Sequence, residues 1–87
     1  MIIMEKLQEY REEIEKIDEE LAKLICKRMD VSLKIGQLKK ENNLSIYDPK
    51  REESLREKNL SRVEEKYKKG YNEILNVILK VSKDLQL

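Results

Sequence analysis

Apolar side chains recur at alternating spacings of three and four residues from about residue 5 to about residue 41. The repeat runs through Leu7, Tyr10, Ile14, Ile17, Leu21, Leu24, Arg28, Val31, Ile35 and Leu38. This spacing places the side chains on one stripe of a helix, as at the a and d positions of a coiled coil. We call this stripe the heptad seam. It predicts one long helix over the first half of the chain.

The length of the heptad seam also predicts a partner. A helix of about 37 residues is about 55 Å long, whereas a compact domain of this size has a radius of gyration of only about 12 Å. The remainder of an 87-residue chain is too short to cover such a stripe. We therefore expect a second copy of the chain to bury it, in a homodimer with crossed long helices, because most soluble oligomers are symmetric dimers.

The second half of the chain predicts two further helices. The segment KENNLSIYD breaks the repeat and is expected to form a loop. Asp48 is a favoured N-cap residue, and Pro49 fits the first position of a short second helix. Ser61, followed by Glu64 three residues later, has the pattern of a capping box for a third helix of medium length. Its expected apolar positions are Tyr67, Tyr71, Ile74, Ile78, Val81 and Leu85. The prediction is an all-α fold of three helices in a single domain, residues 1–87.

Composition excludes several kinds of chemistry. The chain has no histidine and one cysteine, which rules out the usual zinc sites and the Ser-His and Cys-His nucleophile pairs. Charged residues make up 43% of the chain, but the net charge is only +1, so nothing predicts binding to nucleic acid or to an acidic membrane. Cys26 is expected to be a buried apolar residue in a reducing compartment, which indicates the cytoplasm.

Arg28 interrupts the heptad seam, and two further cations, Arg11 and Lys39, lie in the column beside it. A polar residue in a seam can simply fix the register of the helices. Three cations along one stripe instead suggest a bound anion, because arginine binds carboxylates through two parallel hydrogen bonds. Arg28 and Lys39 are about 16 Å apart along a helix, within reach of one small ligand, but Arg11 is about 26 Å from Arg28 and could join only from another chain.

Polar residues near the other two helix ends are further candidates. Ser82 and Gln86 extend the apolar line of Leu75 and Leu79 toward the C-terminus. Arg51 and Glu52 project from the first turn of the second helix, where free backbone N–H groups favour anions. Each of these features is also compatible with an ordinary solvated helix surface.

Together these residues resemble the all-α AroQ class of chorismate mutases over nearly the whole chain. LQEYREEIEKIDEELAKLICKRM resembles the first-helix pattern of that family, KIGQLKKENNLSIYDPKREE resembles its Lys, loop and Asp-x-x-Arg-Glu segment, and SKDLQ resembles its Ser and Gln near the end. The stretch from Asn59 to Gly70 fits the commoner family loop poorly. The resemblance implies an intertwined homodimer with two active sites, each shared between chains.

The resemblance also implies roles for eight residues. Arg28, and Arg11 of the partner chain, would hold the two carboxylates of chorismate, and Lys39 and Gln86 would hydrogen-bond its ether oxygen. Glu52 would accept a hydrogen bond from the ring hydroxyl. Asp48, Arg51 and Ser82 would complete the pocket.

The reaction implied is the intramolecular Claisen rearrangement of chorismate to prephenate, in phenylalanine and tyrosine biosynthesis, and it needs no cofactor or metal. Two alternatives remain open at the level of the sequence. One is a lyase of the same fold that releases pyruvate from isochorismate. The other is a helical pairing module without enzymatic activity, in which Arg28 only fixes the register.

Overall fold

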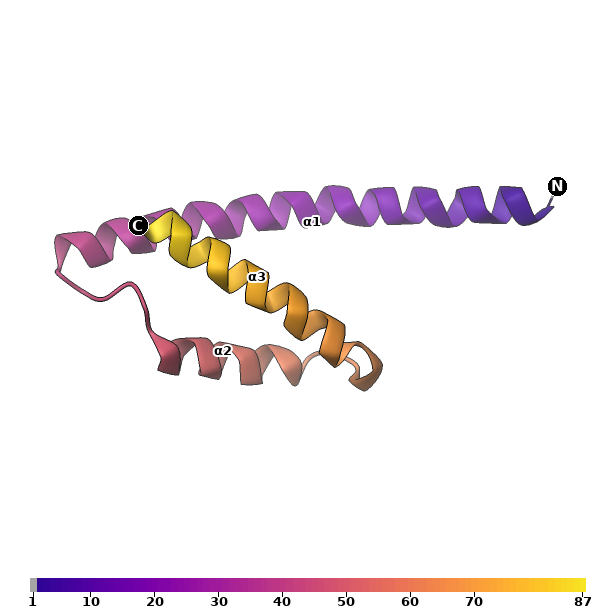
Figure 1. The fold of residues 1–87 in the computed structure, drawn as a ribbon. Helices are drawn as coiled ribbons and strands as arrows, with labels where there is room; N and C mark the ends of the chain where they lie inside the picture. The colour runs from indigo at the N-terminus through magenta and orange to yellow at the C-terminus, as the bar shows by residue number, and fades with distance from the viewer. Residues whose placement is uncertain (1) are drawn as a thin grey trace. The chain divides into compact units, whose positions relative to one another are not determined.

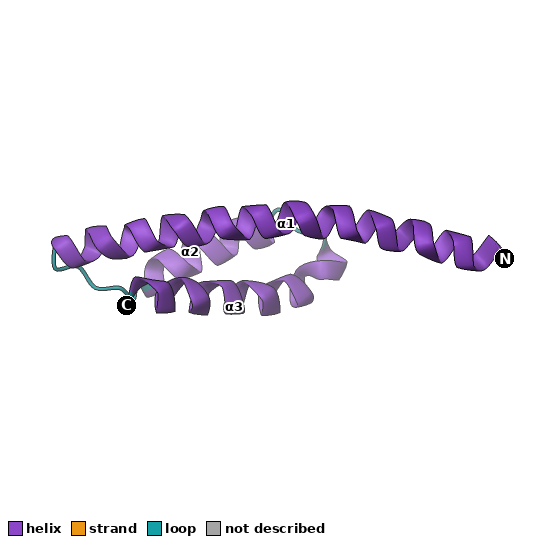
Figure 2. Cartoon of the chain, turned by 90° about the horizontal axis from the view of Figure 1, so that it is seen from above, coloured by secondary structure: helices purple, strands orange, loops and turns teal. Residues whose placement is uncertain are grey.

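A computed structural model describes residues 2–87 of the chain, which consist of three helices joined by short connections. They are α1 (Ile2–Glu41), α2 (Pro49–Leu60) and α3 (Lys68–Gln86), and a single 3-10 turn, η1 (Glu65–Tyr67), precedes α3 (Figures 1 and 2). The described residues include no strand. This confirms the predicted all-α fold with a long, a short and a medium helix. The chain divides within α1 into two parts, residues 1–30 and 31–87, and each is described by itself.

In the first part, α1 exposes the apolar side chains of the heptad seam. Ile14, Ile17 and Leu24 are 56%, 60% and 61% exposed on the single chain. Cys26, which we expected to be buried, is exposed. The reason is its place in the repeat: two residues before Arg28 on a helix of 3.6 residues per turn, it points away from the seam.

The end of α1 is fixed by a Schellman motif. Asn43 adopts a left-handed conformation with φ of 55°. The backbone N–H of Leu44 donates to the carbonyl oxygen of Lys39 at 2.8 Å, and that of Asn43 donates to Lys40 at 3.4 Å. These two bonds satisfy carbonyl groups that the helix leaves free, and asparagine tolerates the left-handed conformation better than most residues. The chain therefore turns sharply here and enters the loop toward α2.

The start of α2 follows the prediction, but its end does not. Asp48 caps the helix by accepting a hydrogen bond from the Arg51 backbone N–H at 3.1 Å, with Pro49 at the first helical position. Ser61, predicted as the cap of the third helix, instead ends α2, where its hydroxyl donates to the carbonyl oxygen of Lys58 at 2.6 Å. A serine hydroxyl can serve either end of a helix, because it is both a donor and an acceptor.

Within residues 31–87, α3 packs against both α2 and the end of α1. The α2–α3 contact includes a hydrogen bond from Arg56 to Asn72. Leu75 and Leu79 are the buried side chains of α3, whereas Ile74 of the predicted apolar line stays 60% exposed. Of the two apolar lines on α3, the one through Leu75 and Leu79 is therefore buried more deeply than the one through Ile74, because the neighbouring helices select among the apolar stripes of α3.

Small residues allow the end of α3 to lie against α1 (Figure 1). Ser32 and Gly36 are the buried residues of α1. A Cβ atom added at Gly36 would lie 2.7 Å from the Cα atom of Gln86. Because real Cβ atoms essentially never come within 3.0 Å of such a neighbour, only glycine fits without a shift of the backbone. Gly36 therefore sets how closely the two helices approach.

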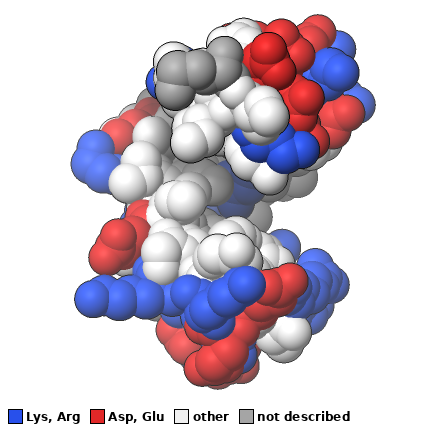
Figure 3. Space-filling view, turned by 90° about the vertical axis from the view of Figure 1, so that its right-hand side faces the viewer, with Lys and Arg blue, Asp and Glu red and all other residues white. Residues whose placement is uncertain are grey.

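The charged surface is mixed in sign. Figure 3 shows Lys and Arg side chains next to Asp and Glu side chains on the face in view. Several neighbours pair along the helices, for example Lys80 with Asp84 at 3.1 Å. Such exposed pairs contribute little to stability. Among residues 2–87, no helix is both long enough and apolar enough to span a membrane.

Candidate active site

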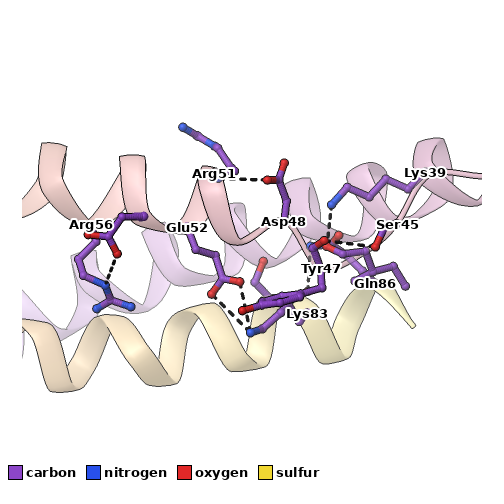
Figure 4. A network of polar contacts seen from close by, with 12 residues as sticks. Lys39, Ser45, Tyr47, Asp48, Arg51, Glu52, Arg56, Lys83 and Gln86 are labelled. Atoms are coloured by element: carbon purple, nitrogen blue, oxygen red, sulfur yellow. Dashed lines mark hydrogen bonds and ion pairs between the residues drawn. The ribbon is translucent and has the colours of Figure 1, made fainter.

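Lys39, the first candidate, lies in the last turn of α1 and is half-buried. Its ammonium group donates to the carbonyl oxygen of Ile46 at 2.9 Å, which ties the connecting loop to the end of α1 (Figure 4). An ammonium group has three N–H donors and this contact uses one of them. Lys39 can therefore hold the loop and still donate to a ligand.

The N-cap and the first turn of α2 carry three candidates with different surroundings. Asp48 is exposed, and its carboxylate is engaged in the helix cap. Arg51 is exposed as well, and its side chain extends away from α3 in Figure 4. Glu52 is half-buried and points toward α3. The two adjacent charges, Arg51 and Glu52, therefore leave the helix in different directions.

Glu52 is paired across the gap between α2 and α3. Both of its carboxylate oxygens lie 3.4 Å from the ammonium nitrogen of Lys83. That nitrogen also lies 4.9 Å from the centre of the Tyr47 ring, a distance at which a cation and an aromatic face attract each other. Three segments, the loop, α2 and α3, thus meet around one cation (Figure 4).

Ser82 and Gln86 stand at the C-terminal end of α3, against α1. The hydroxyl groups of Ser82 and Ser32 are 2.6 Å apart and share a hydrogen bond. The side-chain amide of Gln86 donates to the backbone carbonyl oxygen of Ser82 at 3.2 Å, and its Oε1 atom is buried without a hydrogen-bond partner among the described residues. A buried polar atom without a hydrogen-bond partner lowers stability. The Gln86 oxygen is therefore able to accept a hydrogen bond from a ligand.

The structure therefore places six of the eight candidates in residues 31–87 and two in residues 1–30. The half-buried ones are Lys39, Glu52, Ser82 and Gln86, whereas Asp48 and Arg51 are exposed. In the first part of the chain, Arg28 is half-buried and Arg11 is exposed. The polar candidates that the sequence scatters over the last turn of α1, the first turn of α2 and the end of α3 thus share one part of the chain.

Two residues of this region escaped the sequence interpretation. Ser32 occupies the same column of the heptad repeat as Arg11 and Lys39, and a search for small or polar residues in that column would have found it. Lys83 follows Leu79 by four residues, so it prolongs a buried stripe with a charge. A charge at such a position is a signal, because buried stripes of helices are normally apolar.

The sequence is similar to a known protein family and to two curated relatives. A family model described as chorismate mutase type II matches residues 10–87. A bifunctional chorismate mutase/prephenate dehydratase from Aquifex aeolicus is 42% identical over 64 residues, which are 74% of this chain and 18% of the relative. The T-protein of Haemophilus influenzae is 40% identical over 52 residues, 60% of this chain and 14% of that protein. The chain thus corresponds to less than a fifth of either relative.

A solved structure resembles the chain over nearly its whole length. It is a conserved hypothetical protein from Pyrococcus furiosus with a TM-score of 0.76 and 41% sequence identity, and the match covers 94% of this chain and 96% of that one. The family model covers most of the chain, and its range includes all eight candidates. With three helices of the expected lengths and this match, the chain belongs to the chorismate mutase type II family.

Proposed function

We propose that this protein is a chorismate mutase that rearranges chorismate to prephenate in the biosynthesis of phenylalanine and tyrosine. The family resemblance gives Lys39 and Gln86 contacts with the reacting ether oxygen, and Glu52 a contact with the ring hydroxyl. The observation that carries the proposal is that all three side chains are half-buried in residues 31–87. Most other charged side chains of this part are exposed. Half-buried polar groups hold fixed positions and interact more strongly than solvated ones.

The proposed mechanism uses Lys39 and Gln86 to stabilise charge on the ether oxygen as its C–O bond breaks. Donors that are already in place gain strength from a dry site and need no reorganisation during the reaction. Lys39 has two N–H donors beyond its contact with Ile46. Gln86 commits one amide hydrogen to Ser82, which leaves the second for the substrate.

The remaining roles concern binding of a compact substrate conformer. Glu52 accepts a hydrogen bond from the ring hydroxyl, and Arg28 binds a carboxylate through its planar guanidinium group. Asp48, Arg51 and Ser82 complete the pocket. Holding the two reacting ends of one molecule together can supply a large part of the rate acceleration without any covalent intermediate.

We further propose that the active protein is a homodimer in which Arg11 reaches the site of the partner chain. The support is the heptad seam, whose apolar side chains are largely exposed on the single chain. Exposed apolar stripes of this length mark surfaces that bind another protein. The single cysteine, Cys26, suits a reducing compartment such as the cytoplasm.

The test is product analysis with the purified chain. Chorismate should be converted to prephenate. Arg28→Ala should abolish turnover while the dimer persists, because Arg28 binds the substrate and does not stabilise the apolar contact between the chains. Release of pyruvate from isochorismate without prephenate formation would favour the lyase. A chain that neither converts nor binds a chorismate-like dicarboxylate would be a pairing module instead. Loss of the dimer in Arg28→Ala would also favour the pairing module.

A further inference from the structure

We propose that Lys83 is a positioning residue, which holds the Glu52 carboxylate in place and balances its charge when a dicarboxylate substrate binds. This inference rests on the proposed function, because it concerns the contact of Glu52 with the substrate. The family resemblance implies a role for Glu52 but none for Lys83. The role proposed for Lys83 follows from its own contacts.

The geometry connects Lys83 with both oxygens of Glu52. The two N–O distances are equal, at 3.4 Å, so the ammonium group lies symmetrically in front of the carboxylate. The side chains of Lys83 and Glu52 are only 36% and 22% exposed, in contrast to Lys80, one turn earlier on α3, which is 74% exposed. A pair that is partly withdrawn from water is screened less by salt than a surface pair.

Tyr47 restricts the position of the cation further. The ring of Tyr47 lies against the ammonium group, with 4.9 Å between its centre and the nitrogen. Lys83 therefore has an anion on one helix and an aromatic face on the loop as neighbours, and Glu52 and Tyr47 limit the directions in which its flexible side chain can point (Figure 4). A carboxylate fixed in this way has lost rotational freedom before the substrate arrives, which lowers the entropic cost of binding.

Charge balance gives a second reason for the cation. The proposed substrate carries two carboxylates, and Glu52 would add a third negative charge beside them. Like charges brought together in a partly dry site repel each other. Lys83 compensates this repulsion without touching the substrate, so its loss should weaken substrate binding in the ground state and in the transition state alike.

Uniform weakening of this kind has a kinetic signature. An interaction that is equally strong in both states affects KM and leaves kcat nearly unchanged. Lys83→Met keeps most of the length and packing of the side chain and removes its charge. We expect KM for chorismate to rise about two- to fivefold, as for an interaction between partly exposed charges, with kcat within about a factor of two of wild type. Lys83→Arg should restore most of the loss in KM.

The matched control is Lys80→Met, which removes the same charge from the same helix. Lys80 pairs only with the exposed Asp84 side chain, so KM should stay at the wild-type value. A purely structural role for Lys83 would appear as a lower melting temperature with an unchanged KM, and this result would overturn the proposal. An equal rise of KM in Lys80→Met would also overturn it, because the effect would then be one of net charge.

A double-mutant cycle separates an indirect role from direct contact with the substrate. In a Glu52→Gln background, Lys83→Met should raise KM much less than it does in the wild type, because the charge that Lys83 balances is already gone. An undiminished effect would mean that Lys83 contacts the substrate itself. Turnover by the wild type tests the proposed function separately: a wild type that does not bind or convert chorismate refutes both proposals, whereas an active wild type with an unaffected Lys83→Met refutes only this one.

Discussion

Replacement of Gly36 by alanine tests whether the close approach of α1 and α3 positions the proposed catalytic residues. The added Cβ atom would lie 2.7 Å from the Cα atom of Gln86 and 3.1 Å from its Cβ and carbonyl oxygen atoms. Ordinary van der Waals contact begins at 3.4 Å, so the end of α3 must move by about 0.7 Å. The atoms in the way belong mainly to the backbone, so a change of side-chain rotamer cannot relieve the clash.

Two opposing effects determine the stability of Gly36→Ala. Overpacking of this kind costs about 1–3 kcal/mol, and alanine gains about 1 kcal/mol over glycine inside a helix. We therefore expect a net loss of about 0–2 kcal/mol in the free energy of unfolding. The effect on catalysis should be larger, about tenfold to hundredfold in kcat/KM, because displacements near 1 Å misalign reacting groups.

Gly70→Ala is the control for this experiment. A Cβ atom at Gly70 meets no atom within 4 Å, so this variant gains helix propensity without a clash. It should be about 0.5–1 kcal/mol more stable than wild type in urea denaturation and should keep the wild-type kcat/KM. If Gly36→Ala retained full activity, or if Gly70→Ala lost as much, the contact between Gly36 and Gln86 would not be what positions the site.

Two further predictions concern single side chains. The sequence has no histidine, so the rate of the wild type should be nearly flat between about pH 5.5 and 8. The catalytic rate of Gln86→Glu should fall near neutral pH and recover in acid, because a carboxylate donates a hydrogen bond only when it is protonated. An unchanged pH profile would show that Gln86 does not donate to the ether oxygen. Asp48→Ala should lower the free energy of unfolding by about 1 kcal/mol through loss of the α2 cap, and an unchanged urea midpoint would show that the cap contributes nothing.

Features of the fold that depend on residues close together in sequence were predictable. The alternating spacing from Leu7 to Leu38 indicated the long helix, and Asp48-Pro49 indicated the start of α2, because periodicity and capping are local properties. The same locality explains the error at Ser61, whose capping-box pattern with Glu64 is equally compatible with a serine that ends the preceding helix. Nothing within those four residues distinguishes the two uses.

Features that depend on contacts between helices were harder to predict. The buried stripe of α3 contains Leu75 and Leu79, although Ile74 belongs to an equally good periodic pattern. The hydrogen bond between Ser32 and Ser82 joins residues 50 positions apart, and the pairing of Glu52 with Lys83 spans 31. Such contacts depend on how the helices pack, which their separate patterns do not specify. The residue types of the candidate site could be named from the sequence, whereas Lys83 required the structure.

The most direct test of the proposed enzyme, with its sites shared between chains, is a mixing experiment with two inactive variants. Arg11→Ala and Lys39→Ala should each be nearly inactive as homodimers, because every site lacks one group. After subunit exchange in an equal mixture, about half of the dimers are mixed and each holds one intact site, so prephenate formation should return to about a quarter of the wild-type rate. Verified mixed dimers without any recovered activity would contradict the account, because Arg11 and Lys39 would then have to act within the same chain.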